Sequence, residues 1–176
     1  MKRLMLATAA AVTMILSGCA TTSGLAPDIS KSGFDGAAVV DIAPHANMCL
    51  SLCTTLGAQW SSSRPDVANL RIGIYDLSKF YSIRGAQIRV GQDVIDLTPE
   101  PGITQLEVDP AGVARDSHKW FTVPLDLIRR IAASNDAWIR LNTNAGTVDD
   151  AIIDNGKDSK ALNALKRFLS KVDEQS

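Results

Sequence analysis

Between residues 37 and 123 the chain repeatedly alternates apolar and polar residues, which restricts the fold more than any other feature of the sequence. The clearest run is ANLRIGIYDL, residues 68–77, in which Leu70, Ile72 and Ile74 share one face. Shorter strand-like runs are AAVVDIA, LGAQWSS, ITQLEVD and KWFTV. A period of two with one apolar face is typical of half-buried antiparallel strands. We therefore expect a sheet with one side packed on a core.

Two hairpins are predicted from turn residues between strand-like halves. AQIRVGQDVIDL, residues 86–97, has its turn near Gly91 and Gln92. AWIRLNTNAGTVDDAII, residues 137–153, turns at NAG. Gly and Asn in such positions favour tight hairpin turns, because both tolerate positive φ angles. Both segments add antiparallel strands to the expected sheet.

Two segments in the C-terminal half have a helical period instead. PLDLIRRIAAS, residues 124–134, begins with Pro124, which suits the first helical position. DSKALNALKRFLSKV, residues 158–172, can be capped by Asp158 or Ser159. The apolar faces consist of Leu125, Ile128, Ile131 and Ala132 in the first segment and of Leu162, Leu165, Leu169 and Val172 in the second. The predicted fold is α+β, a mainly antiparallel sheet with two amphipathic helices in the C-terminal half.

The first 18 residues have the composition of an export signal. Lys2 and Arg3 precede an uncharged, mostly apolar run over residues 4–16. That run is too short to span a bilayer, which takes about 20 residues. A positive start, a short apolar run and small residues after it predict a secretory signal peptide that is removed on export.

The apolar run ends in LSGC, residues 16–19, which resembles the lipobox of bacterial lipoproteins. The resemblance implies that residues 1–18 are removed and that Cys19 becomes the N-terminus and carries acyl chains. In the enterobacterial sorting rule an Asp after this cysteine favours the inner membrane, so Ala20 implies an outer-membrane anchor. Two or more acyl chains hold a protein stably on a membrane. The expected location is the bacterial envelope, with the folded domain in the periplasm.

The rest of the chain divides into a tether and one domain. Residues 19–36 hold the cysteine and then small and polar residues with Gly and Pro, which predict a flexible tether. Residues 37–176 suffice for a single α+β domain with its own core. Since Lys2 and Arg3 leave with the signal, the exported chain keeps 16 basic against 19 acidic residues, a net charge of −3. This balance argues against nucleic-acid binding, which needs a strongly basic face.

PHANMCLSLC, residues 44–53, is the stretch richest in reactive side chains. His45, Cys49 and Cys53 suit copper(I) or zinc, but helical spacing would separate His45 from Cys53 by about 12 Å. The C-x-x-x-C spacing also differs from the C-x-x-C of thioredoxin-like proteins.

Export to an oxidising compartment leaves two thiols, those of Cys49 and Cys53, once lipidation has used the third cysteine. Their Cα atoms would lie about 6 Å apart on a helix, within reach of a disulfide. We predict a Cys49–Cys53 disulfide without a metal; the three-residue metal set is the weaker alternative.

The sequence predicts no catalytic arrangement. Asp116, Ser117 and His118 are consecutive, and consecutive side chains of an extended chain point apart, unlike those of a Ser-His-Asp triad. We expect a polar loop there, before the KWFTV strand. The G-x-S-x-G elbow of many hydrolases does not occur. Asp149 and Asp150 are expected on the solvated face of their hairpin.

These observations favour a non-catalytic lipoprotein without a cofactor. Its tryptophans lie in predicted strands, so packing in the core or at its margin is expected of Trp60, Trp120 and Trp138. The leading interpretation is a structural or accessory component of an envelope assembly, with the membrane and an envelope protein as partners. A periplasmic lipoprotein that binds a small ligand or metal is the alternative, and an envelope hydrolase is the third choice. A large exposed apolar patch would favour an assembly, and a deep pocket with converging polar groups would favour a ligand.

Overall fold

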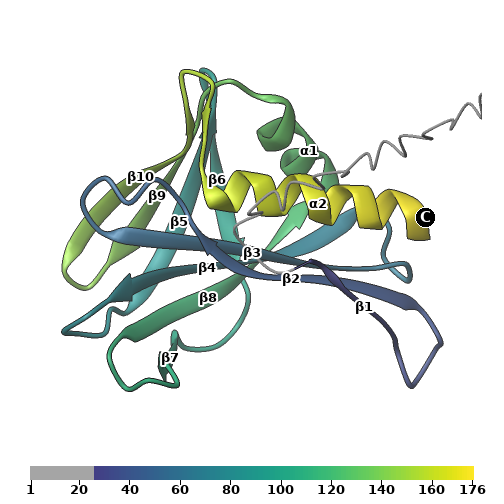
Figure 1. Ribbon diagram of the computed structural model, residues 1–176, viewed down its shortest axis with the longest axis horizontal. Coiled ribbons are helices and arrows are strands. Elements are labelled where there is room, and N and C mark those ends of the chain that lie inside the picture. The colour runs from purple at the N-terminus through teal and green to yellow at the C-terminus, as the bar shows by residue number, and fades with distance from the viewer. Residues whose placement is uncertain (1–25) are drawn as a thin grey trace, which may run out of the picture.

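The structure is a computed structural model that describes residues 26–176 (Figure 1). The predicted signal peptide and Cys19 lie outside the described residues. Along the described chain the elements are β1 (Asp28–Lys31), β2 (Ala38–Ala46), β3 (Cys53–Ser61), β4 (Val67–Asp76), β5 (Ile83–Val90), β6 (Asp93–Pro99), β7 (Gln105–Val108), β8 (Arg115–Pro124), α1 (Leu125–Ala133), β9 (Ala137–Thr143), β10 (Gly146–Asp154), β11 (Lys157–Asp158) and α2 (Lys160–Gln175).

The strands form one sheet that curves into a half-barrel (Figure 1). The order across the sheet is β1-β2-β3-β4-β8-β6-β5-β9-β10-β11, and β7 pairs with β8 beside this path. The paired strands are antiparallel throughout. The predicted fold class is confirmed in its main features, a mostly antiparallel sheet followed by two helices in the C-terminal half.

Strand β8 joins the two halves of the sheet. On one edge it pairs with β4 along its whole length. On the other edge β7 pairs with residues 115–118, and β6 pairs at Phe121 and Thr122. Within residues 26–176, β7 pairs with no strand other than β8, so its second edge carries no strand partner.

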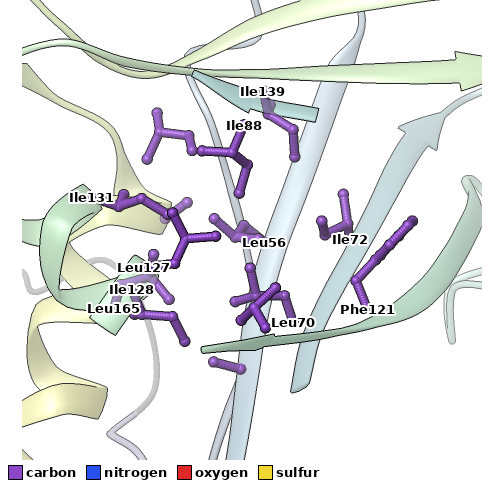
Figure 2. Close-up of a cluster of buried hydrophobic side chains, with 14 of the residues drawn as sticks. Leu56, Leu70, Ile72, Ile88, Phe121, Leu127, Ile128, Ile131, Ile139 and Leu165 are labelled. Carbon is purple, nitrogen blue, oxygen red and sulfur yellow. The ribbon is translucent and has the colours of Figure 1, made fainter. Parts of the chain in front are cut away.

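The core lies between one face of the sheet and the two helices. Figure 2 shows Leu56 and Leu70 of the sheet between Ile128 of α1 and Leu165 of α2 on one side and Ile72 and Phe121 on the other, and all six side chains are buried. Helix α2 packs against β2, β3, β10 and α1. Burying a Leu or Ile side chain stabilises a fold by about 1.5–3 kcal/mol. The alternation that predicts the strands therefore also provides the surface that holds the helices.

Both helices bury the faces expected of them. The Oγ of Ser159 caps α2 by accepting the N–H of Leu162 at 3.1 Å. Helix α1 begins at Leu125, one residue later than predicted, because Pro124 still ends β8. Buried positions include Leu125, Ile128 and Ile131 in α1 and Leu162, Leu165, Leu169 and Val172 in α2.

Both predicted hairpins are confirmed. Strands β5 and β6 pair with Val90 opposite Asp93, and Gly91 in the turn has a φ of 59°. Strands β9 and β10 pair with Thr143 opposite Gly146, whose φ is 111°. Positive φ angles of this size favour glycine, because a Cβ would strain the backbone.

Two segments differ from the expected boundaries. Residues 28–31, assigned above to the tether, form β1 and pair with β2, so the sheet begins before residue 37. The chain reverses there through Asp35, whose carboxylate accepts the N–H of Ala37, and through Gly36 with a φ of 70°. Residues 115–118, expected as a loop, are the first half of β8. The loop prediction was wrong because pairing with β4 and β7 on both edges extends the strand.

Candidate functional site

Charged side chains gather on the outer face of β4 and β8, the face turned away from the helices. Alternate residues of β4 face the core, which places Arg71 and Tyr75 on the outer side. In the antiparallel register Asp116 of β8 lies opposite Tyr75. His118 lies two residues further along β8, on the same side as Asp116. Its ring is nevertheless 2% exposed, because neighbouring side chains cover it.

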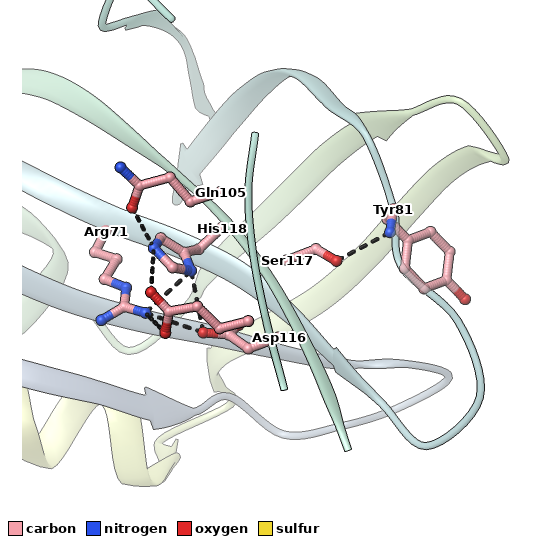
Figure 3. A network of polar contacts seen from close by, with 7 residues as sticks. Arg71, Tyr81, Gln105, Asp116, Ser117 and His118 are labelled. Carbon is pink, nitrogen blue, oxygen red and sulfur yellow. Dashed lines mark hydrogen bonds and ion pairs between the residues drawn. The ribbon is translucent and has the colours of Figure 1, made fainter. Parts of the chain in front are cut away.

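Strand β7 completes the cover over this histidine. Gln105 lies opposite His118 in the register and Glu107 lies opposite Asp116. The Oε1 of Gln105 is 2.6 Å from Nε2 of His118 (Figure 3). The carboxylate of Glu107 reaches Arg71 at 3.3 Å. These five residues, Arg71, Gln105, Glu107, Asp116 and His118, are called the His118 cluster below.

The hydrogen bonds of His118 restrict its protons to two arrangements. In both arrangements Nε2 carries a proton and donates it to the amide oxygen of Gln105, because that oxygen can only accept a hydrogen bond. Nδ1 lies 3.0 Å from Nη2 of Arg71 and 3.1 Å from Oδ2 of Asp116 (Figure 3). A neutral ring accepts from Arg71, and a protonated ring donates to Asp116. With Glu107 included, the net charge of the cluster is −1 in the first arrangement and 0 in the second.

Three residues of the His118 cluster have side chains that commonly bind metal ions. Glu107, Asp116 and His118 offer ligand atoms that all lie within 4.8 Å of one another. However, Nη2 of Arg71 lies 3.0 Å from the aspartate, 3.0 Å from the histidine and 3.3 Å from the glutamate. The guanidinium therefore occupies the position that a bound ion would need. We interpret the cluster as an ion-pair network in which Arg71 supplies the positive charge.

A hollow of about 360 Å³ opens beside the cluster. Pro44, Val108 and Pro110 give it an apolar wall. The charged lining residues in the described part of the chain are Arg71, Glu107, Asp109 and Asp116. Three carboxylates against one guanidinium make the lining net negative. We call this feature the acidic hollow.

The hydrogen bonds of Asp109 keep its charge in place at the rim. Its Oδ1 accepts the backbone N–H of Ala114 at 2.9 Å and of Val113 at 2.6 Å. These two hydrogen bonds hold the pKa of Asp109 below its ordinary value, and the bond from Ala114 contributes more than the bond from Val113. The pKa of the Tyr75 phenol is raised, mainly by desolvation and to a smaller extent by the negative charge of the Asp109 carboxylate. The rim of the acidic hollow therefore carries an ionised Asp109 beside a neutral phenol at neutral pH.

The structure joins Cys49 and Cys53 in a disulfide, in support of the prediction. The local geometry differs from the helix assumed for it. Cys49 lies in the connection between β2 and β3 and Cys53 is the first residue of β3; their Cα atoms are 4.1 Å apart, and Cys49 has a φ of 57°. His45 belongs to β2 and its Nδ1 lies 2.6 Å from the carbonyl oxygen of Ala43. While the sulfurs are bonded to each other, the alternative metal set of His45, Cys49 and Cys53 has no thiolate to offer.

Asp150, expected on a solvated face, is instead fully buried and organises this loop. Its Oδ2 accepts the backbone N–H of Cys49 at 3.1 Å and of Thr54 at 3.3 Å. Its Oδ1 accepts the N–H of Leu50 at 3.2 Å. The expectation fails because Asp150 lies on the inner face of β10, whereas Asp149 lies on the outer face and pairs with Arg140 as expected of an exposed residue.

The three consecutive residues of the hydrolase alternative do not converge. Ser117 is fully buried on the inner face, where its Oγ accepts the N–H of Tyr81 at 2.9 Å. Asp116 and His118 lie on the outer face (Figure 3). Consecutive side chains of β8 point apart, as the sequence indicates. What the sequence did not predict is the pairing of Asp116 with His118 and with Arg71.

The tryptophans divide between the core and the outer face. Trp60 is buried in the core, and Trp120 and Trp138 are half-buried. A second hollow, of about 270 Å³, lies against Trp138 with Arg89 and Arg140 in its lining. Both guanidinium groups are already held by aspartates, at 2.6 Å and 2.7 Å. This second hollow therefore has less free charge than the acidic hollow.

Comparisons with models of protein families, with curated proteins and with solved structures found no match to this chain. In the part of the chain that the structure describes, neither helix has the length and apolar character needed to cross a membrane. The features that bear on function are therefore the geometry of the outer face and the sequence of the N-terminus.

Proposed function

We propose that this protein is a lipid-anchored accessory component of the bacterial envelope whose domain binds another envelope protein along β7 without catalysing a reaction. Cys19 anchors it to the outer membrane, and residues 26–176 fold in the periplasm. The observation that carries the proposal is the second edge of β7, which lacks a strand partner within the described residues.

An edge strand offers backbone N–H and C=O groups to another chain, and proteins usually protect such edges with charges, bulges or covering segments. Strand β7 is exposed at all four residues. Its charged residue, Glu107, is turned toward Arg71 and does not guard the other face. A partner strand that pairs with this edge would satisfy its backbone groups, the mode known as β-augmentation.

Apolar side chains surround the same edge. Leu106 and Val108 are 53% and 52% exposed, and Ile103 and Val113 on the flanking loops are exposed as well. Exposed apolar groups that gather at one place favour a protein interface over open solvent. A partner strand that docks on β7 would pair with its backbone and bury these apolar side chains at the same time.

The docking can be tested by photo-crosslinking in the native bacterium. A photo-reactive amino acid replaces Val113, in the loop beside β7, or Ile29 on the distant edge strand β1. We expect a discrete crosslinked product from position 113 and none of the same mass from position 29. The double change Leu106→Lys with Val108→Lys should abolish the product, whereas the control Ile29→Lys should preserve it.

Two results would contradict the proposal. One is the absence of a discrete product at position 113. The other is a product that survives the double lysine variant, because an interface on β7 cannot tolerate two buried charges. Thermal unfolding of each variant shows whether it keeps its fold, and the exposure of both side chains predicts that it does.

A further inference from the structure

We infer that the strand that docks on β7 places a basic side chain, Lys or Arg, against the carboxylates of Glu107 and Asp109 on the β7 side of the acidic hollow. The inference rests on the proposed function, since it names the chemistry of the partner. It joins three features of one place: the alternation of β7, the negative lining of the hollow and the apolar wall beside the carboxylates.

The alternation of β7 sets which partner residues face the hollow. Gln105 and Glu107 point to the outer face, where they contact His118 and Arg71. Leu106 lies opposite the inward-facing Ser117 in the register. A strand added to the edge of β7 continues the same pleat, so its side chains alternate between the two faces. Every second residue of the partner therefore lies on the same face as Glu107 and next to the β7 side of the hollow, whereas Asp116 and Arg71 lie beyond β7, on β8 and β4.

The charges around the hollow favour a cation on that side. Arg71 is shared between Asp116 and Glu107. Asp109 forms no direct salt bridge within residues 26–176, and Arg115 acts on it only as a more distant charge. Glu107 is 59% exposed and has room to turn toward an incoming group. The hollow thus keeps an excess of negative charge, whichever proton arrangement His118 adopts.

The shape and the wall favour a long side chain over a bare ion. A metal ion would have to displace the guanidinium of Arg71, which contacts all three candidate ligands. Lys and Arg have apolar stems that cover apolar surface while their charged ends reach polar groups. Val108 and Pro110, on the β7 side of the hollow, provide that surface. The partner segment is therefore expected to alternate apolar and basic residues.

Three matched peptides test this expectation: blocked heptapeptides of alternating Val and Lys, Val and Gln, or Val and Glu. The lipidated full chain is placed in phosphatidylcholine nanodiscs, with empty nanodiscs as the blank, and binding is measured by fluorescence anisotropy. We expect the lysine peptide to bind about fivefold to tenfold more tightly than the glutamine peptide and the glutamate peptide to bind most weakly. The preference should disappear in Glu107→Gln with Asp109→Asn and should remain in the exposed control Glu174→Gln.

The outcomes separate the inference from the docking itself. Equal binding of all three peptides, with loss of all three in the Leu106→Lys, Val108→Lys variant, would overturn the inference and retain the docking on β7. Failure of every peptide to bind would overturn the inference and leave crosslinking at position 113 to judge the docking. If N-acetyllysine methylamide binds as tightly as the lysine peptide, the hollow is a site for a free small cation and the inference is overturned as well.

Discussion

The carboxylate of Asp150 accepts the backbone N–H of Cys49 at 3.1 Å, although the two residues are 101 positions apart in the chain. This contact ties the loop that the disulfide closes to the inner face of β10. Asn47 extends the tie, because its Nδ2 donates to Oγ1 of Thr54 at 2.8 Å and Thr54 in turn donates to Asp150 at 2.9 Å. The loop is therefore held by a buried carboxylate and a covalent bond together.

Replacing Asp150 should cost more stability than replacing its neighbour. We expect Asp150→Ala to lower the free energy of unfolding by about 3 kcal/mol or more. The buried N–H and hydroxyl of Thr54 lose their acceptor, at about 1–3 kcal/mol each, and the partly buried N–H groups of Cys49 and Leu50 lose theirs as well. Asp149→Ala is the matched control and should cost less than about 1 kcal/mol, as for an exposed ion pair. Urea unfolding of both variants measures the difference. Equal costs would show that the carboxylate of Asp150 does not hold the loop.

Loss of the disulfide should weaken the domain without unfolding it. The closed loop is short, so the chain-entropy relation gives about 2 kcal/mol for the bond. Cys49→Ser with Cys53→Ser should lower the unfolding free energy by that amount, and thiol labelling of periplasmic protein under denaturing conditions should require reductant. Complete labelling of both cysteines without reductant would refute the bond. Because Asp150 and the disulfide hold the same loop, we expect their effects to be non-additive in a double-mutant cycle.

The sequence predicts best the features that repeat along the chain. Leu70, Ile72 and Ile74 indicate β4 by their period of two, and Leu162 and Leu165 indicate α2 by their spacing. Strand β1 carries no such signal, because DISK has a single apolar residue, Ile29, and backbone pairing alone defines it. Strand β7 is equally exposed, but the alternation in ITQLEVD indicates it. A single sequence therefore finds the strands that alternate and misses the one that does not.

The site was harder to predict than the fold, since it depends on register. Asp149 and Asp150 are identical neighbours in the sequence, and only the side of β10 on which each lies separates the exposed one from the buried one. The contact of Arg71 with His118 requires β4 and β8 to pair so that Gly73 lies opposite His118. The period-two spacing of Asp116 and His118 could have indicated a shared face. Their partner on β4, 45 positions from Asp116 in the chain, could not be found from one sequence.

Helix α2 should contribute to stability through its buried face. Leu165 is fully buried against the sheet, so Leu165→Ala should cost about 2–5 kcal/mol. Lys160→Ala on the exposed side of the same helix should change stability by less than about 0.5 kcal/mol. Chemical denaturation compares the two variants. A cost below about 0.5 kcal/mol for the leucine would contradict the packing of α2 on the core.

Asp76 gives the fold a defined sensitivity to acid. The backbone N–H of Ser78, and then its hydroxyl, lower the pKa of Asp76 from 3.8 to about 2. A carboxyl group whose pKa is lower in the folded state stabilises the fold above its unfolded pKa, and this contribution is lost as the pH falls through the folded pKa. We therefore expect Asp76→Asn to be less stable than the wild type at pH 6 and to approach it in stability as the pH falls from about 4 to 2. A difference that stays constant across this window would contradict the assignment.

Lipidation at Cys19 should be required for maturation. Mass spectrometry of the protein from bacterial membranes should show an N-terminal acylated cysteine at this position, as its resemblance to a lipobox implies. Cys19→Ser should block acylation and leave the signal peptide attached. An unmodified N-terminus at Met1 or elsewhere would refute the anchor and, with it, the proposed location.

Hydrogen exchange at β7 tests the central claim most directly, because the account requires another chain to pair with this strand in the envelope. Exchange is followed by mass spectrometry in the lipoprotein purified alone and in membranes isolated with its partners, with β1 as the internal reference edge strand. We predict that amides of residues 105–108 exchange more slowly in the membranes while those of residues 28–31 exchange at the same rate in both samples. Equal exchange of residues 105–108 in both samples would contradict docking on β7.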